Sequence, residues 1–178
     1  MTNLNQLSLV LVFKIPLPVI LSKLVENFYN SKSIGNHKFS LKALSTPEVI
    51  AANDSTQLET LIMKLGAANA KATLNVYNET IKKRSSPQAL KAFNCCIEAQ
   101  KYAVSSFEMV SLELIKDHQT ANYDITVIGL EITNCEKKLV DAKVQAPQLL
   151  TENRFRQYYI TMGGEITSSL ELENQNEY

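Results

Sequence analysis

The clearest pattern in the chain is a row of apolar residues that recurs at alternating steps of four and three between positions 121 and 142. This heptad spacing places its members on one side of an α-helix, and that side must be buried against other helices. The row comprises Ala121, Ile125, Ile128, Ile132, Cys135, Leu139 and Ala142. We therefore expect a long amphipathic helix here, preceded by a polar segment at 116–122 and closed by Pro147.

Apolar stripes at helical spacing also run through 55–83, 87–115 and 152–170. Ser86 before Pro87 is typical of an N-cap followed by proline at the first helical position, and Thr151 is expected to cap the last helix. The stripes comprise Leu58, Leu61, Ile62, Leu65, Ala68, Ala72, Val76 and Ile81, then Leu90, Phe93, Ile97, Val104, Phe107, Ser111 and Leu114, and finally Phe155, Tyr159, Met162, Ile166 and Leu170.

Shorter elements precede these helices. Residues 24–46 contain brief amphipathic stretches around a turn at Gly35 and Asn36, which predicts a short helical hairpin. Thr46 and Pro47 should open a short helix that ends before Asn53 and Asp54. Because four apolar stripes must be covered, the predicted fold class is all-α, an antiparallel four-helix bundle with a short N-terminal helical hairpin extension.

The expected organisation is a signal peptide at 1–22, the hairpin region at 23–54, the bundle at 55–172 and a frayed tail at 173–178. Two apolar runs, 7–13 and 15–21, flank Lys14, but the proline interruptions make this an imperfect secretory signal. The alternative is a segment packed against the bundle or a partner. Asn53 and Asn78 each begin a glycosylation sequon, in keeping with secretion.

Charge and motifs narrow the function. Lys and Arg together number 18, as do Asp and Glu, so no net field attracts nucleic acid or a membrane surface. Nucleophile elbows, phosphate loops, dinucleotide fingerprints and zinc-helix motifs are absent from the sequence. With only two histidines and no zinc-type spacing, we expect neither a metal nor another cofactor, and no catalytic residues. The sequence favours a binding protein over an enzyme.

Three cysteines permit one disulfide. Cys96 lies near the start of one predicted helix and Cys135 near the end of the next, so antiparallel packing brings them to similar heights, with the turn near their midpoint. Cys95 points about 100° away around its helix, which favours Cys96 as the partner. The alternative is three buried thiols in a reducing compartment.

Four segments together resemble the plant invertase and pectin methylesterase inhibitor family. They read LIMKLGAANAKATLNVYNET at 61–80, NCCIEAQKYAVSSFEMV at 94–110, KDHQTANYDITVIGLEITNCEKKL at 116–139 and ENRFRQYYITMGGEITSSL from 152. The resemblance spans roughly 24–170, and its register independently implies a Cys96–Cys135 bridge. One departure is clear: Ser40 and Tyr29 stand where the family has an N-terminal cysteine pair.

The resemblance implies a secreted inhibitor that binds an invertase and occludes its active site without turnover. In that branch of the family the contact lies in the connection between the bridged helices, here Lys116, Asp117, His118, Gln119, Thr120, Ala121, Asn122 and Tyr123. The alternatives are a pectin methylesterase inhibitor that binds through helix faces, and a non-inhibitory interaction protein that lost activity with the N-terminal disulfide. We expect a monomer or weak dimer in the apoplast or cell wall, with the vacuole as a second compartment.

Overall fold

The computed structural model describes residues 23–30, 37–83 and 86–175, and every regular element within these ranges is helical. Three short helices, α1 (Lys23–Tyr29), α2 (His37–Leu44) and α3 (Pro47–Ile50), precede four long ones. The long helices are α4 (Ser55–Ile81), α5 (Pro87–Glu113), α6 (His118–Asp141) and α7 (Pro147–Gln175). The predicted turn at Gly35 and Asn36 and the predicted leader at 1–22 lie outside the described residues.

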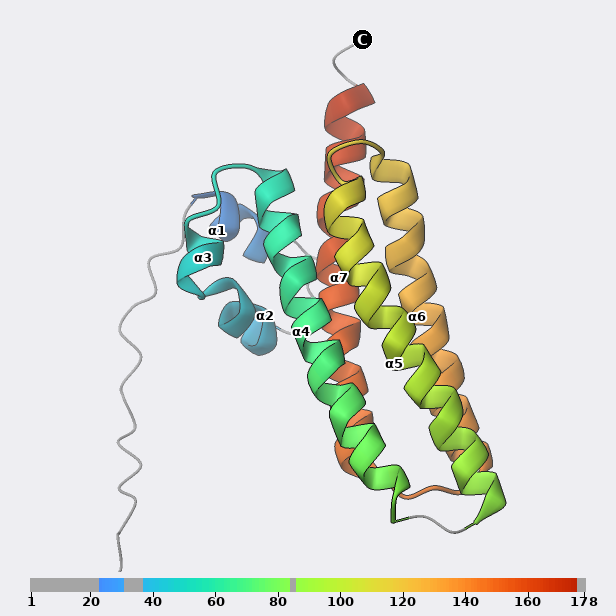
Figure 1. Cartoon of the computed structure of the whole chain (residues 1–178). Coiled ribbons are helices and arrows are strands. Elements are labelled where there is room, and N and C mark those ends of the chain that lie inside the picture. The colour runs from blue at the N-terminus through green and yellow to red at the C-terminus, as the bar shows by residue number, and fades with distance from the viewer. Residues whose placement is uncertain (1–22, 31–36, 84–85, 176–178) are drawn as a thin grey trace, which may run out of the picture.

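The long helices form an antiparallel bundle in which α4 packs on α5 and α7, and α6 also packs on α5 and α7 (Figure 1). The short helices lie against α4 and α7 at one side. The predicted all-α four-helix bundle with an N-terminal extension is therefore confirmed. Among the described residues, no helix has both the length and the apolar character needed to cross a membrane.

Local signals explain where three long helices begin. The Asp54 carboxylate accepts a hydrogen bond from the Gln57 backbone N–H at 2.7 Å, which caps α4. Ser86 caps α5 immediately before Pro87, as predicted. Thr151, the predicted cap of the last helix, lies inside α7, and its hydroxyl donates to the Pro147 carbonyl. The prediction was wrong because Pro147 suits the first helical position, and burial of Leu149 favours the longer helix.

The core confirms the predicted stripe of α6 for the six residues from Ala121 to Leu139, which are buried, whereas Ala142 is half-buried just after the helix. The predicted stripe of α4 needs a correction, because Ala68 and Ala72 are exposed. The buried side of α4 includes instead Met63, Gly66, Ala67, Ala70, Thr73 and Tyr77. Two packing partners cover a wide side of α4, and the hydroxyls of Thr73 and Tyr77 have hydrogen-bond partners that make their burial tolerable.

Candidate functional site

The connection between α5 and α6 forms a compact tip at one end of the bundle, beside the end of α7 (Figure 1). Helix α5 ends at Glu113, and α6 begins at His118. The backbone N–H groups of Lys116 and Asp117 both donate to the Glu113 carbonyl at 2.8 Å. These bonds complete the end of α5, so the chain reverses direction within a few residues.

The predicted contact segment 116–123 is therefore largely not a loop. Lys116 and Asp117 belong to the connection, whereas the remaining residues form the first turns of α6. They are His118, Gln119, Thr120, Ala121, Asn122 and Tyr123. The physical reason is the Asp117 carboxylate, which accepts from the Thr120 backbone N–H at 3.0 Å and from its hydroxyl at 2.7 Å. This N-cap starts the helix within a polar run that the sequence presented as irregular.

Electrostatics reinforce this geometry. The bonds from Thr120 lower the pKa of Asp117, so the cap keeps its charge in mildly acidic solution. Burial raises the pKa of Glu113, and the nearby charges of Asp124 and Asp117 act in the same direction. The pKa values of Glu113 and Asp117 are therefore shifted in opposite directions at the tip.

Large apolar side chains are exposed around this tip. Exposure is 51% for Met109, 69% for Leu112, 75% for Ile115 and 69% for Tyr123. We did not predict Leu112 or Ile115 as surface features, although their positions off the buried stripe of α5 could have indicated it. Apolar groups gathered on a surface often mark a protein contact. We define Met109, Leu112, Ile115 and Tyr123 as the tip surface.

The tip surface stands on a well-packed base. Phe107, Val110, Leu114 and Ala121 are fully buried, and Ile125 is 1% exposed. They face the bundle from the same turns that carry the exposed residues. Packing against these buried residues therefore holds the tip in one position.

The disulfide predicted between Cys96 and Cys135 is present, with Cα atoms 4.7 Å apart, and Cys95 is the free, half-buried thiol. The bridge joins the far halves of α5 and α6. Counting 1.5 Å per helical residue places it roughly 25 Å from the tip. The disulfide fixes the register of the two helices, whereas the Asp117 cap and local packing determine the conformation of the tip.

A buried polar network lies beside this bridge. The Asn153 amide nitrogen donates to the Tyr77 hydroxyl at 3.1 Å, and that hydroxyl lies 3.6 Å from the sulfur of Cys135. Gln100 and Arg156 both donate to the Asn153 side-chain oxygen, at 3.1 and 3.3 Å. Burial lowers the pKa of Arg156 to about 10. The network links α7 to α4 through Tyr77 and to α5 through Gln100, so it ties three of the four long helices together beside the disulfide.

Aromatic packing attaches the N-terminal extension to the bundle. The ring of Phe39 in α2 stacks on Phe155 of α7 with centroids 5.3 Å apart, and it meets Tyr159 edge-on at 5.1 Å. Ser40 is buried, and Tyr29 packs against the core from α1. The two positions without cysteine thus lie on neighbouring helices that contact each other.

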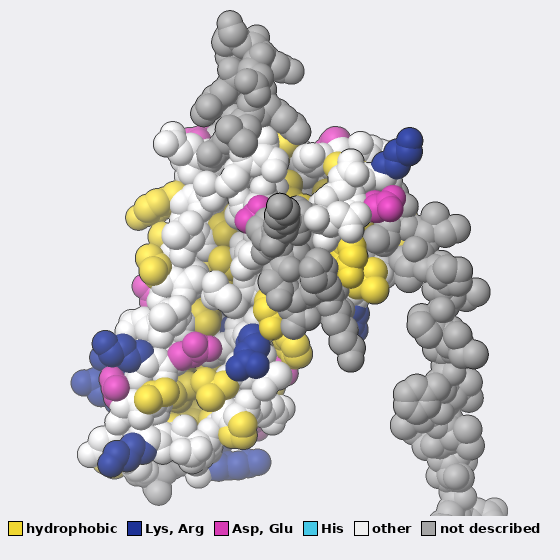
Figure 2. Space-filling view, turned by 180° about the vertical axis from the view of Figure 1, so that it is seen from behind, with side chains coloured by type: hydrophobic (Ala, Val, Ile, Leu, Met, Phe, Trp, Pro, Cys, Tyr) yellow, Lys and Arg dark blue, Asp and Glu magenta, His cyan; other side chains and the backbone are white. Residues whose placement is uncertain are grey.

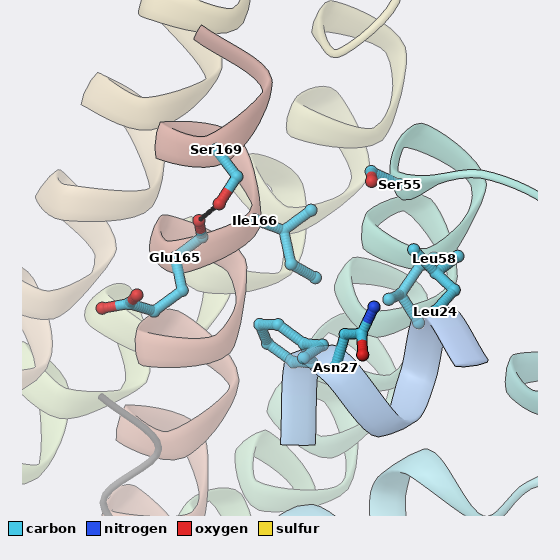
Figure 3. A pocket seen from close by; sticks show the side chains of 8 residues that line it. Leu24, Asn27, Ser55, Leu58, Glu165, Ile166 and Ser169 are labelled. Atoms are coloured by element: carbon cyan, nitrogen blue, oxygen red, sulfur yellow. Dashed lines mark hydrogen bonds between the residues drawn. The ribbon is translucent and has the colours of Figure 1, made fainter. Parts of the chain in front are cut away.

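A pocket of about 300 Å³ lies between α1, the start of α4 and α7. Figure 3 shows Leu24 and Asn27 of α1 opposite Ile166 of α7, with Leu58 of α4 beside them. The Glu165 carboxylate extends away from these side chains (Figure 3). In the part of the chain that the structure describes, no group of three His, Cys, Asp or Glu side chains could hold a metal ion.

The surface charges are mixed, and the two sequon asparagines lie in ordinary surroundings on α4 and just before it. The face shown in Figure 2 carries side chains of both charges among groups of hydrophobic residues. Asn53 is exposed before α4, and its amide donates to Gln57 at 3.2 Å. Asn78 is half-buried near the end of α4. The geometry at these positions provides neither a nucleophile nor a general base.

Comparison with known proteins finds a likeness among solved structures. No protein-family model matches the sequence, and no curated protein sequence matches it. The crystal structure of a pectin methylesterase inhibitor from Arabidopsis thaliana superposes with a TM-score of 0.60, covering 82% of this chain and 93% of that chain at 16% identity. The described helices therefore adopt the fold of a pectin methylesterase inhibitor, which is the fold that the sequence resemblance implied.

Proposed function

We propose that this chain is a protein inhibitor of a secreted plant carbohydrate-active enzyme, with an invertase as the leading target and a pectin methylesterase as the alternative. The observation that carries the proposal is the match of the bundle to a pectin methylesterase inhibitor over 93% of that protein. The invertase preference rests on the sequence resemblance around 116–122. Inhibition is by steric occlusion, and the chain performs no chemistry.

The tip surface is the part of the bundle best suited to enter a partner's active site. It exposes four large apolar side chains, two on the last turns of α5, one on the short connection and one on the second turn of α6. A preorganised contact of this kind loses little conformational entropy on binding. Aromatic and other large side chains near the centre of an interface commonly dominate its affinity. We therefore expect Leu112, Ile115 and Tyr123 to contribute most of the binding free energy.

The test is a parallel titration of the purified full chain against an acid invertase and a pectin methylesterase, with a pull-down to detect binding without inhibition. Stoichiometric inhibition of the invertase is expected. Inhibition of the esterase alone would select the alternative target. Binding without inhibition of either enzyme would favour the non-inhibitory interaction protein and contradict the proposal.

Two matched substitutions on α6 locate the contact. Tyr123 and Leu130 are 69% and 64% exposed and lie seven residues apart, on nearly the same side of the helix. Tyr123→Ala should weaken inhibition about 30-fold, the loss of one strong interface residue. Leu130→Ala, two turns further from the tip, should leave inhibition unchanged. Equal effects of both substitutions would place the contact along a helix face rather than at the tip.

The same proposal includes an extracellular location, a cleaved leader and glycans on Asn53 and Asn78. The two sequons support this part, and the exposure of Asn53 makes it the better acceptor. Mass mapping of the protein from its native tissue would identify the mature N-terminus and any glycan. An uncleaved, unglycosylated chain with three free thiols would contradict secretion.

A further inference from the structure

A cavity of about 480 Å³ lies between α2 and the two bundle helices α4 and α7. It is separate from the tip surface, which is built by α5 and α6 (Figure 1). Its volume falls within the range of roughly 300–1,000 Å³ that is common for small-molecule sites. Its walls come from side chains four residues apart on the bundle helices, Leu65 with Asn69 on α4 and Phe155 with Tyr159 on α7.

Most of this lining is apolar, and its aromatic rings pack against one another. The ring of Phe39 on α2 is held against α7 by stacking on Phe155 and by an edge-on contact with Tyr159. Leu65 and Ala43 complete the apolar surface from α4 and α2. The cavity therefore offers flat aromatic walls to a ligand with an aromatic or branched aliphatic body.

The polar group from α4 is oriented by the buried network. The Asn69 side-chain oxygen accepts from Arg156 at 3.3 Å. A guanidinium has no acceptor, so the atom facing it must be the oxygen of the amide. The Asn69 amide group is therefore left with its two N–H donors for a ligand. Asn69 also lines the cavity, so Arg156 fixes which chemistry this residue presents.

The polar groups from the N-terminal extension are also donors. Lys42 is exposed, lines the cavity and forms no ion pair with another described residue. Thr46 lines it too, and its hydroxyl makes no hydrogen bond that caps α3. The cavity is thus lined by one cationic side chain, Lys42, and by the donating amide of Asn69. Such a set of groups recognises an acceptor with negative charge.

We propose that this cavity binds a small amphipathic organic anion, a carboxylate with an aromatic or branched aliphatic body. The body lies against Phe39, Leu65, Phe155 and Tyr159, and the carboxylate meets Lys42 and Asn69. Occupancy does not require α5 or α6, so the site operates alongside a partner bound at the tip surface.

The test compares two probes of nearly equal shape, 2-naphthylacetate and its neutral amide, 2-naphthylacetamide. Both are titrated into the isotopically labelled full chain, and binding is followed by amide chemical shifts in NMR spectra. We expect the acid to bind saturably, with shifts concentrated at 39–46, 65–69 and 155–159. The amide should bind at least about threefold more weakly, since it lacks the charge-assisted contact.

Three variants complete the design. Lys42→Met keeps the apolar stem and should reduce the affinity for the acid to that for the amide, whereas Lys64→Met, an exposed lysine outside the lining, should change neither. Ala43→Leu fills the cavity and should abolish binding of both probes while the circular dichroism spectrum stays helical. Equal affinity for acid and amide, no binding of either, or unchanged binding to Ala43→Leu would overturn the proposal.

Discussion

Glu59 is a carboxyl group that lies entirely within the bundle, between α4 and α7. It has no exposed surface, and one of its oxygens is hydrogen-bonded to the hydroxyl of Thr167. That hydroxyl also lies 2.8 Å from the Gly163 carbonyl oxygen. A hydroxyl has one proton, so it cannot donate to both acceptors. A protonated Glu59 resolves this conflict, because its carboxyl proton goes to Thr167 and the Thr167 proton goes to Gly163, while the second Glu59 oxygen stays without a partner.

The pKa of Glu59 is shifted upward, which agrees with a protonated carboxyl group. Burial raises the pKa of Glu59 from 4.5 to about 8. A bond donated by Thr167 to the ionised carboxylate would act in the opposite direction, and it is the smaller of the two effects. Above pH 4.5 the unfolded chain releases this proton while the native state retains it, so the free energy of unfolding falls as the pH rises. The stabilisation is complete below pH 4.5 and is lost progressively toward pH 8. Between pH 5.0 and 7.5 the loss is roughly 3 kcal/mol.

Glu59→Gln removes the ionisation and preserves the shape. Near pH 5 the variant should be no more stable than the wild type, because the buried amide replaces a neutral acid and leaves one N–H unpaired. As the pH rises, the wild type weakens and the variant does not. The difference in unfolding free energy, variant minus wild type, should therefore increase by roughly 3 kcal/mol between pH 5.0 and 7.5.

Urea unfolding followed by circular dichroism at several pH values measures this difference. Effects common to both proteins, including those of the lowered pKa values of Glu79 and Asp117, cancel in the comparison. Glu98→Gln is the matched control, since Glu98 lies on the solvent side of α5, and its difference from the wild type should stay nearly constant. A constant difference for Glu59→Gln as well would refute the assignment of a proton to Glu59.

Three further predictions concern the helix contacts. Replacing Cys96 and Cys135 together by alanine opens a bridge across 39 residues and should cost about 4 kcal/mol, seen as a fall of roughly 8–16 °C in the melting temperature. Gly164→Ala should raise the unfolding free energy by about 0.5–1 kcal/mol in urea, because an added methyl meets nothing within 4 Å. Gly66→Ala should lower it by about 1–3 kcal/mol in the same assay, because the methyl would lie 3.0 Å from the buried Phe107 ring. An increase for Gly66→Ala would mean that this ring can move.

Some of the candidate site could be read from local sequence, and some could not. The positions of Cys96 and Cys135 in the predicted helices indicated their pairing, and the register of the family resemblance implied it. The composition of 116–122 predicts a polar connection, and the family resemblance implies a loop at 116–123. Asp117 instead caps α6 through Thr120, and this contact places Tyr123 on a helix near the tip. A polar composition indicates that a segment is exposed to solvent, but it does not say whether the segment is helical. Here the Asp117 N-cap makes it helical.

What the sequence determined by itself is the set of helices, because an apolar residue every three or four positions is a local property of the chain. The stripe of α6, the starts at Pro47 and Pro87 and the all-α class follow from it. The tertiary structure alone decided which side of α4 is buried, since Ala67 and Ala68 differ in burial only through the helices that pack beside them. It also decided the burial of Glu59 and Arg156, whose partners Thr167 and Asn69 lie on another helix. A polar side chain is buried where a residue distant in the sequence forms a hydrogen bond with it. The spacing of apolar residues along the chain does not indicate which residue that is.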